Sequence, residues 1–210
     1  MFNTVHLPPV ALSCVAKAAR RRFNADCLGV MKTPLSAFVD RIRAEQQLGI
    51  EVPDFDPGNG NEVAKYLFVL EAPGPKAVET GFISFENPDQ TARNFRQQLG
   101  LAQICRNDIV VWNIVPWYVG NDAMTQIRAV QRDEITLGTQ YLLQLLKLLP
   151  NLRCIVLVGG AARRAHVPLS AATTARILSC HHPSPRAMNL QPAARTENVE
   201  VFRFMRLSTA

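Results

Sequence analysis

Four short apolar runs punctuate the chain from residue 66 onward, and segments with helical spacing separate them. The runs are YLFVL at residues 66–70, IVVWNIV at 109–115, CIVLV at 154–158 and RILSC at 176–180. Short runs that are rich in β-branched residues and lack alternation are typical of strands covered on both faces, as in a parallel sheet. The pattern therefore predicts four buried strands.

The segments between these runs carry apolar residues at helical spacing. Phe95 and Leu99 lie four positions apart within residues 90–99, and residues 133–149 present a broad apolar face. Such spacing predicts helices that pack one face against a sheet. A further amphipathic helix is predicted over residues 35–48. Strands that alternate with helices favour a layered α/β domain.

A chain of 210 residues is most simply one domain, since a chain of this length buries roughly 70% of the surface that its unfolded form exposes. We predict a single domain over residues 1–210, with residues 1–61 as a helical and loop extension packed on the rest. The segment EVPDFDPGNGN at 51–61 is rich in turn residues and predicts a loop.

Charge and cysteine usage narrow the class of protein. The chain has 23 Lys and Arg residues against 17 Asp and Glu residues, a net charge of +6, which favours polyanionic partners such as nucleic acid. Residues 20–22, Arg163, Arg164 and Arg186 are candidate phosphate contacts, although such arginines also occur as solvated surface. The five cysteines are scattered without a C-x-x-C pair, so no zinc or iron–sulfur site is predicted.

The start of the chain has the wrong order of apolar and basic residues for a secretory signal. No apolar run approaches the roughly 18 residues that a membrane-spanning helix needs. We therefore expect a cytoplasmic protein with no membrane association.

Distinctive sequences accompany the end of each predicted strand. EAPGP begins at Glu71, Asn113 lies within the second run, glycines occupy 159–160, and HHPSP begins at His181. The glycine pair lacks the G-x-G-x-x-G pattern and the Walker lysine, so a tight strand-to-helix turn accounts for it better than a phosphate loop. Because parallel strands end at one edge of a sheet, Glu71, Asn113 and His182 are expected to converge there.

Each of these side chains also fits an ordinary structural role. Glu71 fits an exposed loop carboxylate, and His182 fits the shoulder of the stiff turn that Pro183 and Pro185 make. Asn113 fits such a role least, since a buried carboxamide needs partners for two donors and an acceptor. A ligand with a complementary polar edge would supply them.

Two motifs resemble the uracil-DNA glycosylase superfamily. EAPG at 71–74 is similar to the first motif of the branch that carries G-E-A-P-G, and HPSP at 182–185 is similar to its second motif. The resemblance spans about residues 66–189. It implies a three-layer α/β/α fold with a central, mainly parallel four-stranded sheet. It also implies base excision repair: hydrolysis of the N-glycosidic bond of uracil, or a related deaminated base, in DNA after base flipping.

The resemblance further implies roles for single residues. His182 would stabilise the charge on the departing base at uracil O2, and Glu71 would position the attacking water. Asn113 would read the O4 and N3 edge of uracil and reject cytosine. Phe85 would stack on the flipped base, unless it is simply a core residue. The full predicted base-binding set is Ala72, Pro73, Gly74, Phe85 and Asn113.

DNA is the expected partner of the second motif. Ser184 and the amides near Pro185 would grip phosphate, and Arg186 stands where relatives insert a wedge into the duplex; arginine there would fill the gap or bind phosphate. The iron–sulfur cysteines of the G-E-A-P-G relatives are absent, so no cluster, other cofactor or metal is expected. The protein is also expected to act as a monomer.

Three positions depart from the family pattern. Ala72 stands where other branches carry a water-activating Asp or Asn, and Leu70 replaces the first glycine of the motif. These changes keep open an alternative: a catalytically weak or inactive DNA-binding protein of the same fold. Gly74 stands where some relatives place a tyrosine that excludes the thymine methyl, which predicts tolerance of 5-substituted uracils.

Two other chemistries fit the region less well. A hydrolase with Ser184 or Cys180 as its nucleophile lacks the G-x-S-x-G elbow. A metal site at residues 181–182 is disfavoured because adjacent side chains tend to diverge and no nearby cysteine or carboxylate completes a ligand set.

Overall fold

The computed structural model describes residues 32–121 and 123–209. From Thr33 onward the described chain forms one compact unit. The arginines at 20–22, and the first half of the predicted 1–61 extension, lie outside the described residues. None of the described helices is both long and apolar enough to cross a membrane.

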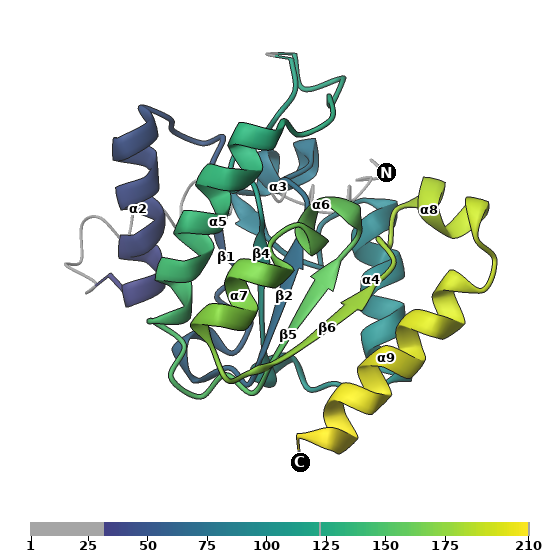
Figure 1. Cartoon of the computed structure of the whole chain (residues 1–210). Helices are drawn as coiled ribbons and strands as arrows, with labels where there is room; N and C mark the ends of the chain where they lie inside the picture. Colours follow the sequence, from purple (N-terminus) through teal and green to yellow (C-terminus); the bar gives the residue numbers. More distant parts are fainter. Residues whose placement is uncertain (1–31, 122, 210) are drawn as a thin grey trace, which may run out of the picture. The chain divides into compact units, whose positions relative to one another are not determined.

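A parallel sheet of four strands forms the centre of this unit (Figure 1). The strands lie in the order β4-β2-β5-β6 and match the four predicted runs, except that β4 ends two residues early, at Asn113. Their bounds are β2 Tyr66–Leu70, β4 Ile109–Asn113, β5 Cys154–Val158 and β6 Arg176–Cys180. Every residue of β4 and β5 is buried, as expected for strands covered on both faces.

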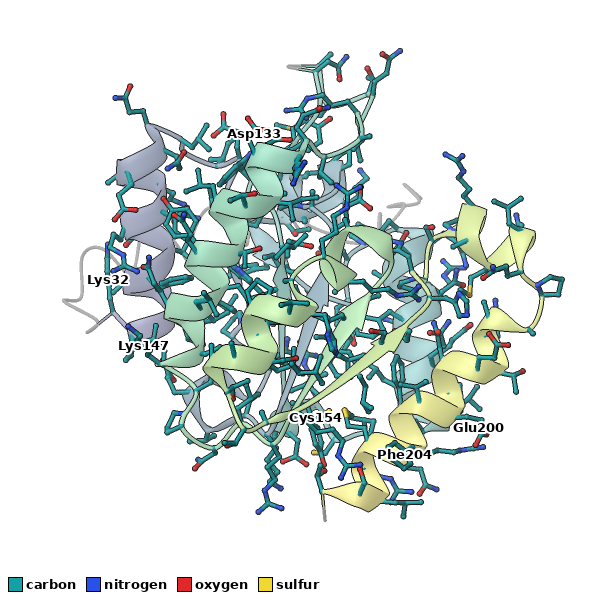
Figure 2. All side chains as sticks on the ribbon, in the orientation of Figure 1. Lys32, Asp133, Lys147, Cys154, Glu200 and Phe204 are labelled. Carbon is teal, nitrogen blue, oxygen red and sulfur yellow. The ribbon has the colours of Figure 1, made fainter. Side chains whose placement is uncertain are left out.

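Helices cover both faces of the sheet, so the fold is the predicted three-layer α/β/α arrangement. Helices α5 (Arg132–Leu146) and α7 (His166–Ala172) lie on one face, and α4 (Gln90–Leu101) and α9 (Ala194–Ser208) lie on the other (Figure 1). Side chains fill the spaces between the layers, while Phe204 and Glu200 lie on the outer side of α9 (Figure 2).

Close approach of α5 to the sheet depends on a glycine. A Cβ added to Gly138 would lie 1.7 Å from the backbone oxygen of Ile114, directly after β4. Glycine is therefore required in the middle of this helix, although it lowers intrinsic helix stability. The helix ends at Leu146, earlier than the predicted 149, and Leu149 is still buried in the core.

The described part of the predicted extension packs on the domain. Helix α2 (Pro34–Gln46) begins after Thr33, whose hydroxyl accepts from Ser36 N, and Gln46 donates to the Tyr141 hydroxyl of α5 over 2.8 Å. The predicted 51–61 loop is partly wrong, because β1 (Asp54–Phe55) pairs in parallel with β3 (Phe82–Ile83). A two-residue strand is too short to leave a hydrophobic pattern.

Short helices follow the strand ends. They are α3 (Pro75–Thr80) after β2, α6 (Gly160–Arg163) after β5 and α8 (Pro185–Leu190) after β6. Two single 3₁₀ turns, Asn61–Val63 and Arg106–Asp108, precede β2 and β4. The glycine pair is a strand-to-helix turn, as predicted. The expected Pro-Ser-Pro turn is corrected in one respect: Pro185 begins α8, because proline at the first helical position forfeits no hydrogen bond and already has a helical φ.

Candidate active site

A cavity of about 350 Å³ opens at the carboxyl ends of the strands. Most of the predicted site residues contribute to its lining, from the end of β4 and from segments that follow β2, β3 and β6 in the chain. The predicted residues that line it are Ala72, Pro73, Gly74, Phe85, Asn113, His182 and Ser184. The other three predicted site residues, Glu71, Pro185 and Arg186, are not part of the lining.

The parallel register brings these distant segments together. Leu70 pairs with Asn113, so the EAPG segment starts beside the end of β4, and Ile114 N donates to Leu70 O over 2.8 Å. On the other side of β2, Val158 pairs with Cys180. The sequences that follow these paired residues therefore emerge at one edge of the sheet, as sequence reasoning predicted.

Asn113 contributes a donor without a partner. Its side chain is 2% exposed, and its Nδ2 has no hydrogen-bond partner among the described residues. A buried amide left unpaired costs free energy comparable to a lost hydrogen bond. The carboxamide lines the cavity, so a ligand that presents an acceptor there would remove this cost.

His182 lines the same cavity in a defined state. Its Nδ1 accepts from the Ser184 backbone N over 3.2 Å, so the proton of the neutral ring lies on Nε2. Burial lowers the pKa of His182 from 6.5 to about 4, because desolvation disfavours the imidazolium. The ring is thus a neutral hydrogen-bond donor at physiological pH.

Gly159 makes room for this histidine. Its φ of +87° suits glycine, and a Cβ there would lie 3.1 Å from the His182 Cβ. The lack of a side chain at Gly159, the first glycine of the pair, thus leaves space for His182.

Phe85 forms part of the cavity wall and is braced from behind. The ring is 6% exposed, and the Arg106 guanidinium lies 5.0 Å from its centroid. Arg106 in turn donates to the buried Asp56 over 2.6 Å, and Ser84 also donates to Asp56. Phe85 also packs edge-on against Phe95, so it is a core residue that also lines the cavity, and its stacking on a base stays a prediction.

A protein-family model also matches this part of the chain. The family model of the uracil DNA glycosylase superfamily matches residues 57–205, which is most of the chain. The chain belongs to the uracil-DNA glycosylase superfamily. No curated protein sequence matches it.

A solution NMR structure of a Methanosarcina acetivorans protein, provisionally named a uracil DNA glycosylase, is similar at 16% identity and a TM-score of 0.45. The similarity covers 70% of this chain and 93% of the other. The family assignment rests on the family model, to which this weak similarity adds nothing.

The carboxylates of this superfamily member are arranged differently from expectation. Glu71 is half-buried after β2 and outside the cavity lining. Among the described lining residues, Asp89 is the only carboxylate, and sequence reasoning missed it. Asp89 is the N-cap of α4, where its Oδ1 accepts from Ala92 N over 2.9 Å.

The second superfamily motif lies partly at the rim of the cavity. Ser184 is the N-cap of α8, where its hydroxyl accepts from Ala187 N over 3.4 Å. Arg186 lies exposed in the first turn of α8. Arg163, a candidate phosphate contact, donates to Cys180 O over 2.9 Å, so it also braces the end of β6.

The described residues do not form a metal or iron–sulfur site. Within residues 32–121 and 123–209, no three His, Cys, Asp or Glu side chains gather closely enough to bind a metal. Cys180 is buried, and desolvation raises the pKa of its thiol to about 12. A thiol that stays protonated is a poor nucleophile, which argues against the hydrolase alternative at Cys180.

Two further asparagines near the site were missed by sequence reasoning. Asn94 on α4 is 3% exposed and Asn198 on α9 is fully buried, and both hydrogen-bond to the backbone of the His-Pro turn. A polar residue on the apolar face of an amphipathic helix is the signal that would have found them.

Proposed function

We propose that this protein removes uracil, or a related deaminated base, from DNA by hydrolysing the N-glycosidic bond. The observation that carries the proposal is that Asn113, whose Nδ2 is buried without a partner, lines the same cavity as His182. Uracil O4 would accept from this donor, and the carboxamide oxygen of Asn113 would accept from N3–H. Cytosine would place an amino donor against Nδ2, which leaves both donors unpaired.

The bond broken is the one between C1′ and N1 of the flipped nucleotide. The base would stack on Phe85 and leave with the electron pair of the C1′–N1 bond, while a water oxygen bonds to C1′ and gives its proton to a carboxylate, for which Asp89 on the cavity wall is the candidate. Charge then develops at O2, where Nε2–H of His182 donates a hydrogen bond. A preorganised donor of this kind contributes about 2.7–4 kcal/mol to transition-state stabilisation.

The same site supports a substrate range that includes 5-substituted uracils. Gly74 lines the cavity, and a Cβ added there would meet no described atom within 4 Å. We expect the purified protein to cleave 5-hydroxymethyluracil as well as uracil, and Gly74→Tyr to reduce cleavage of the substituted base more than cleavage of uracil. Equal loss on both bases would contradict this steric argument.

A DNA-binding protein without chemistry is the second candidate. It is favoured by Ala72, which places no polar group where other branches activate water, and by the position of Glu71 outside the cavity lining. Such a protein would bind uracil-containing DNA and leave it intact.

The deciding experiment is incubation with a labelled oligonucleotide that carries one uracil, as a single strand and as a U:G duplex, followed by alkaline cleavage. We expect strand scission with the wild type and a loss of about 10²–10³-fold with His182→Gln. His181→Gln is the matched control, since the His181 ring pairs with Glu197 at 2.7 Å on the surface and should leave the rate unchanged. An intact oligonucleotide that the protein nevertheless binds would support the second candidate.

A further inference from the structure

Two buried asparagines hold the backbone on both sides of His182. Asn198, from α9, accepts from His181 N over 2.8 Å and donates to His181 O over 3.0 Å. Asn94, from α4, donates to Pro183 O over 2.8 Å. The residues before and after His182 are thus fixed by side chains from two helices on the same face of the sheet.

The two carboxamides are themselves held by neighbouring amides. Gln98 is 1% exposed, and its Oε1 accepts from Asn198 Nδ2 over 3.0 Å. Gln90 Nε2 donates to Asn94 Oδ1 over 2.9 Å. Chains of satisfied buried hydrogen bonds are rigid and geometrically specific, so each asparagine has little freedom to rotate.

This arrangement meets a need of the local backbone. After β6 ends at Cys180, the amide and carbonyl groups of the His-Pro turn are no longer paired within the sheet and still lie among buried groups. Buried backbone groups require partners, and an apolar residue at position 198 would leave the His181 N–H and C=O without theirs. The carboxamide of Asn198 pairs with both groups at once.

We propose that Asn198 and Asn94 are positioning residues that hold the His182 ring against the cavity as the Nε2–H tautomer. The inference rests on the proposed function for its effect on catalysis. With the backbone fixed at His181 and Pro183, the ring is confined further by Gly159 on one side and by Ser184 N at its Nδ1. Each contact favours the same orientation, with Nε2–H free for the base.

The kinetic test compares Asn198→Ala and Asn94→Ala with the wild type in steady-state kinetics on a uracil oligonucleotide. A misplacement of a donor by about 1 Å costs up to about 100-fold in rate, so we expect kcat to fall by about 10- to 100-fold with KM nearly unchanged. Asn94→Ala removes fewer contacts to the turn and is the usable variant if Asn198→Ala does not fold.

Phe202→Leu is the matched control for lost stability. Phe202 lies one helical turn beyond Asn198 on α9, is fully buried and packs 5.2 Å from Phe68 in the core. This variant should lower the melting temperature and keep the wild-type kcat at temperatures where it is folded. An equal loss of kcat in Phe202→Leu would overturn the positioning role.

A spectroscopic readout separates this inference from the proposed function. Imidazole ¹⁵N spectra, with His182 assigned from the spectrum of His182→Gln, should show one Nε2–H tautomer in the wild type and a tautomer mixture in the asparagine variants. Unchanged His182 signals in both variants, or a mixture in the wild type, would overturn the inference. If the wild type releases no uracil, the proposed function fails, and these spectra still decide whether the asparagines position the ring.

Discussion

At the scale of single residues, Asn113 and His182 show two different effects of burial in one cavity. Burial leaves the Asn113 Nδ2 without a partner, which creates a binding preference for an acceptor. Burial of His182 lowers the pKa of its ring to about 4, which keeps the ring neutral. Both side chains are therefore uncharged, and neither changes its charge in the physiological pH range.

Two conservative variants test which carboxylate would position the attacking water. We expect Asp89→Asn to lower kcat by about 10²–10⁴-fold, the range for loss of a general base, because Asp89 is the carboxylate on the cavity wall. Asparagine is also a good N-cap, so α4 should stay stable. Glu71→Gln should have the smaller effect on the rate of uracil release, and the reverse order would return the role to Glu71.

The lowered pKa of His182 predicts an acid limb of activity near pH 4 instead of near 6.5. Protonation would put a proton on Nδ1, which now accepts from Ser184 N, and would turn the ring out of its favoured contact. The measurement is the pH dependence of kcat/KM for uracil release. A fall in activity centred near pH 6.5 would show that the folded protein does not hold the ring neutral.

The same shift links His182 to stability. Between pH 6.5 and 4 the unfolded chain binds a proton at this histidine and the folded protein does not, so the free energy of unfolding decreases as the pH falls through this window. His182→Gln should lose less stability across it. Urea titrations at several pH values, with wild type and variant in parallel, measure the difference.

At the scale of elements, strand ends carry the site and helices hold it in place. Strand β4 delivers Asn113 as its last residue, and β6 ends immediately before the His-Pro turn. Helices α4 and α9 then supply the asparagines that fix this turn. Helix α5 supports β4 from the opposite face, through the close contact at Gly138.

Gly138→Ala should destabilise the protein by about 1–3 kcal/mol or more, the usual range for overpacking. The added Cβ would lie 1.7 Å from a backbone oxygen that has no flexible group to move. Gly100→Ala is the control, since Gly100 lies in α4 and a Cβ there meets no described atom within 4 Å. The control should gain up to about 1 kcal/mol from helix propensity, and thermal unfolding measures both changes.

At the scale of the whole molecule, the net charge of +6 favours association with DNA and makes it depend on salt. We expect Arg186→Ala to weaken binding to all sequences equally and to reduce the slope of log K against log salt concentration by about one. Arg203→Ala is the control, because Arg203 pairs with Glu200 at 2.7 Å on α9. Equal slopes for Arg186→Ala and the wild type would exclude a phosphate contact at this position.

The sequence predicted the four strands closely because short apolar runs rich in β-branched residues are characteristic of strands buried on both faces. The sequence also predicted that Asn113 and His182 belong to the candidate site. Asn113 lies within a predicted strand, and His182 follows one and begins the HPSP motif. Strand β1 was missed because two residues are too few to show an alternation of apolar and polar positions. Asp89, Asn94 and Asn198 were missed because polar residues on helices are common, and what gives these three their roles is a turn or a cavity wall built from other elements.

The sequence by itself determined the layered α/β class, the strand set and the two motifs, because these depend on local hydrophobic pattern and on the order of residues along one chain. Only the tertiary structure decided which side chains share the cavity: it includes Asp89 and leaves Glu71 outside. It also decided that Asn113 Nδ2 lacks a partner and that Asn94 and Asn198 hydrogen-bond to the backbone on both sides of His182. The physical reason is that burial, hydrogen-bond satisfaction and pKa depend on neighbours contributed by distant segments, and no local pattern encodes those distances.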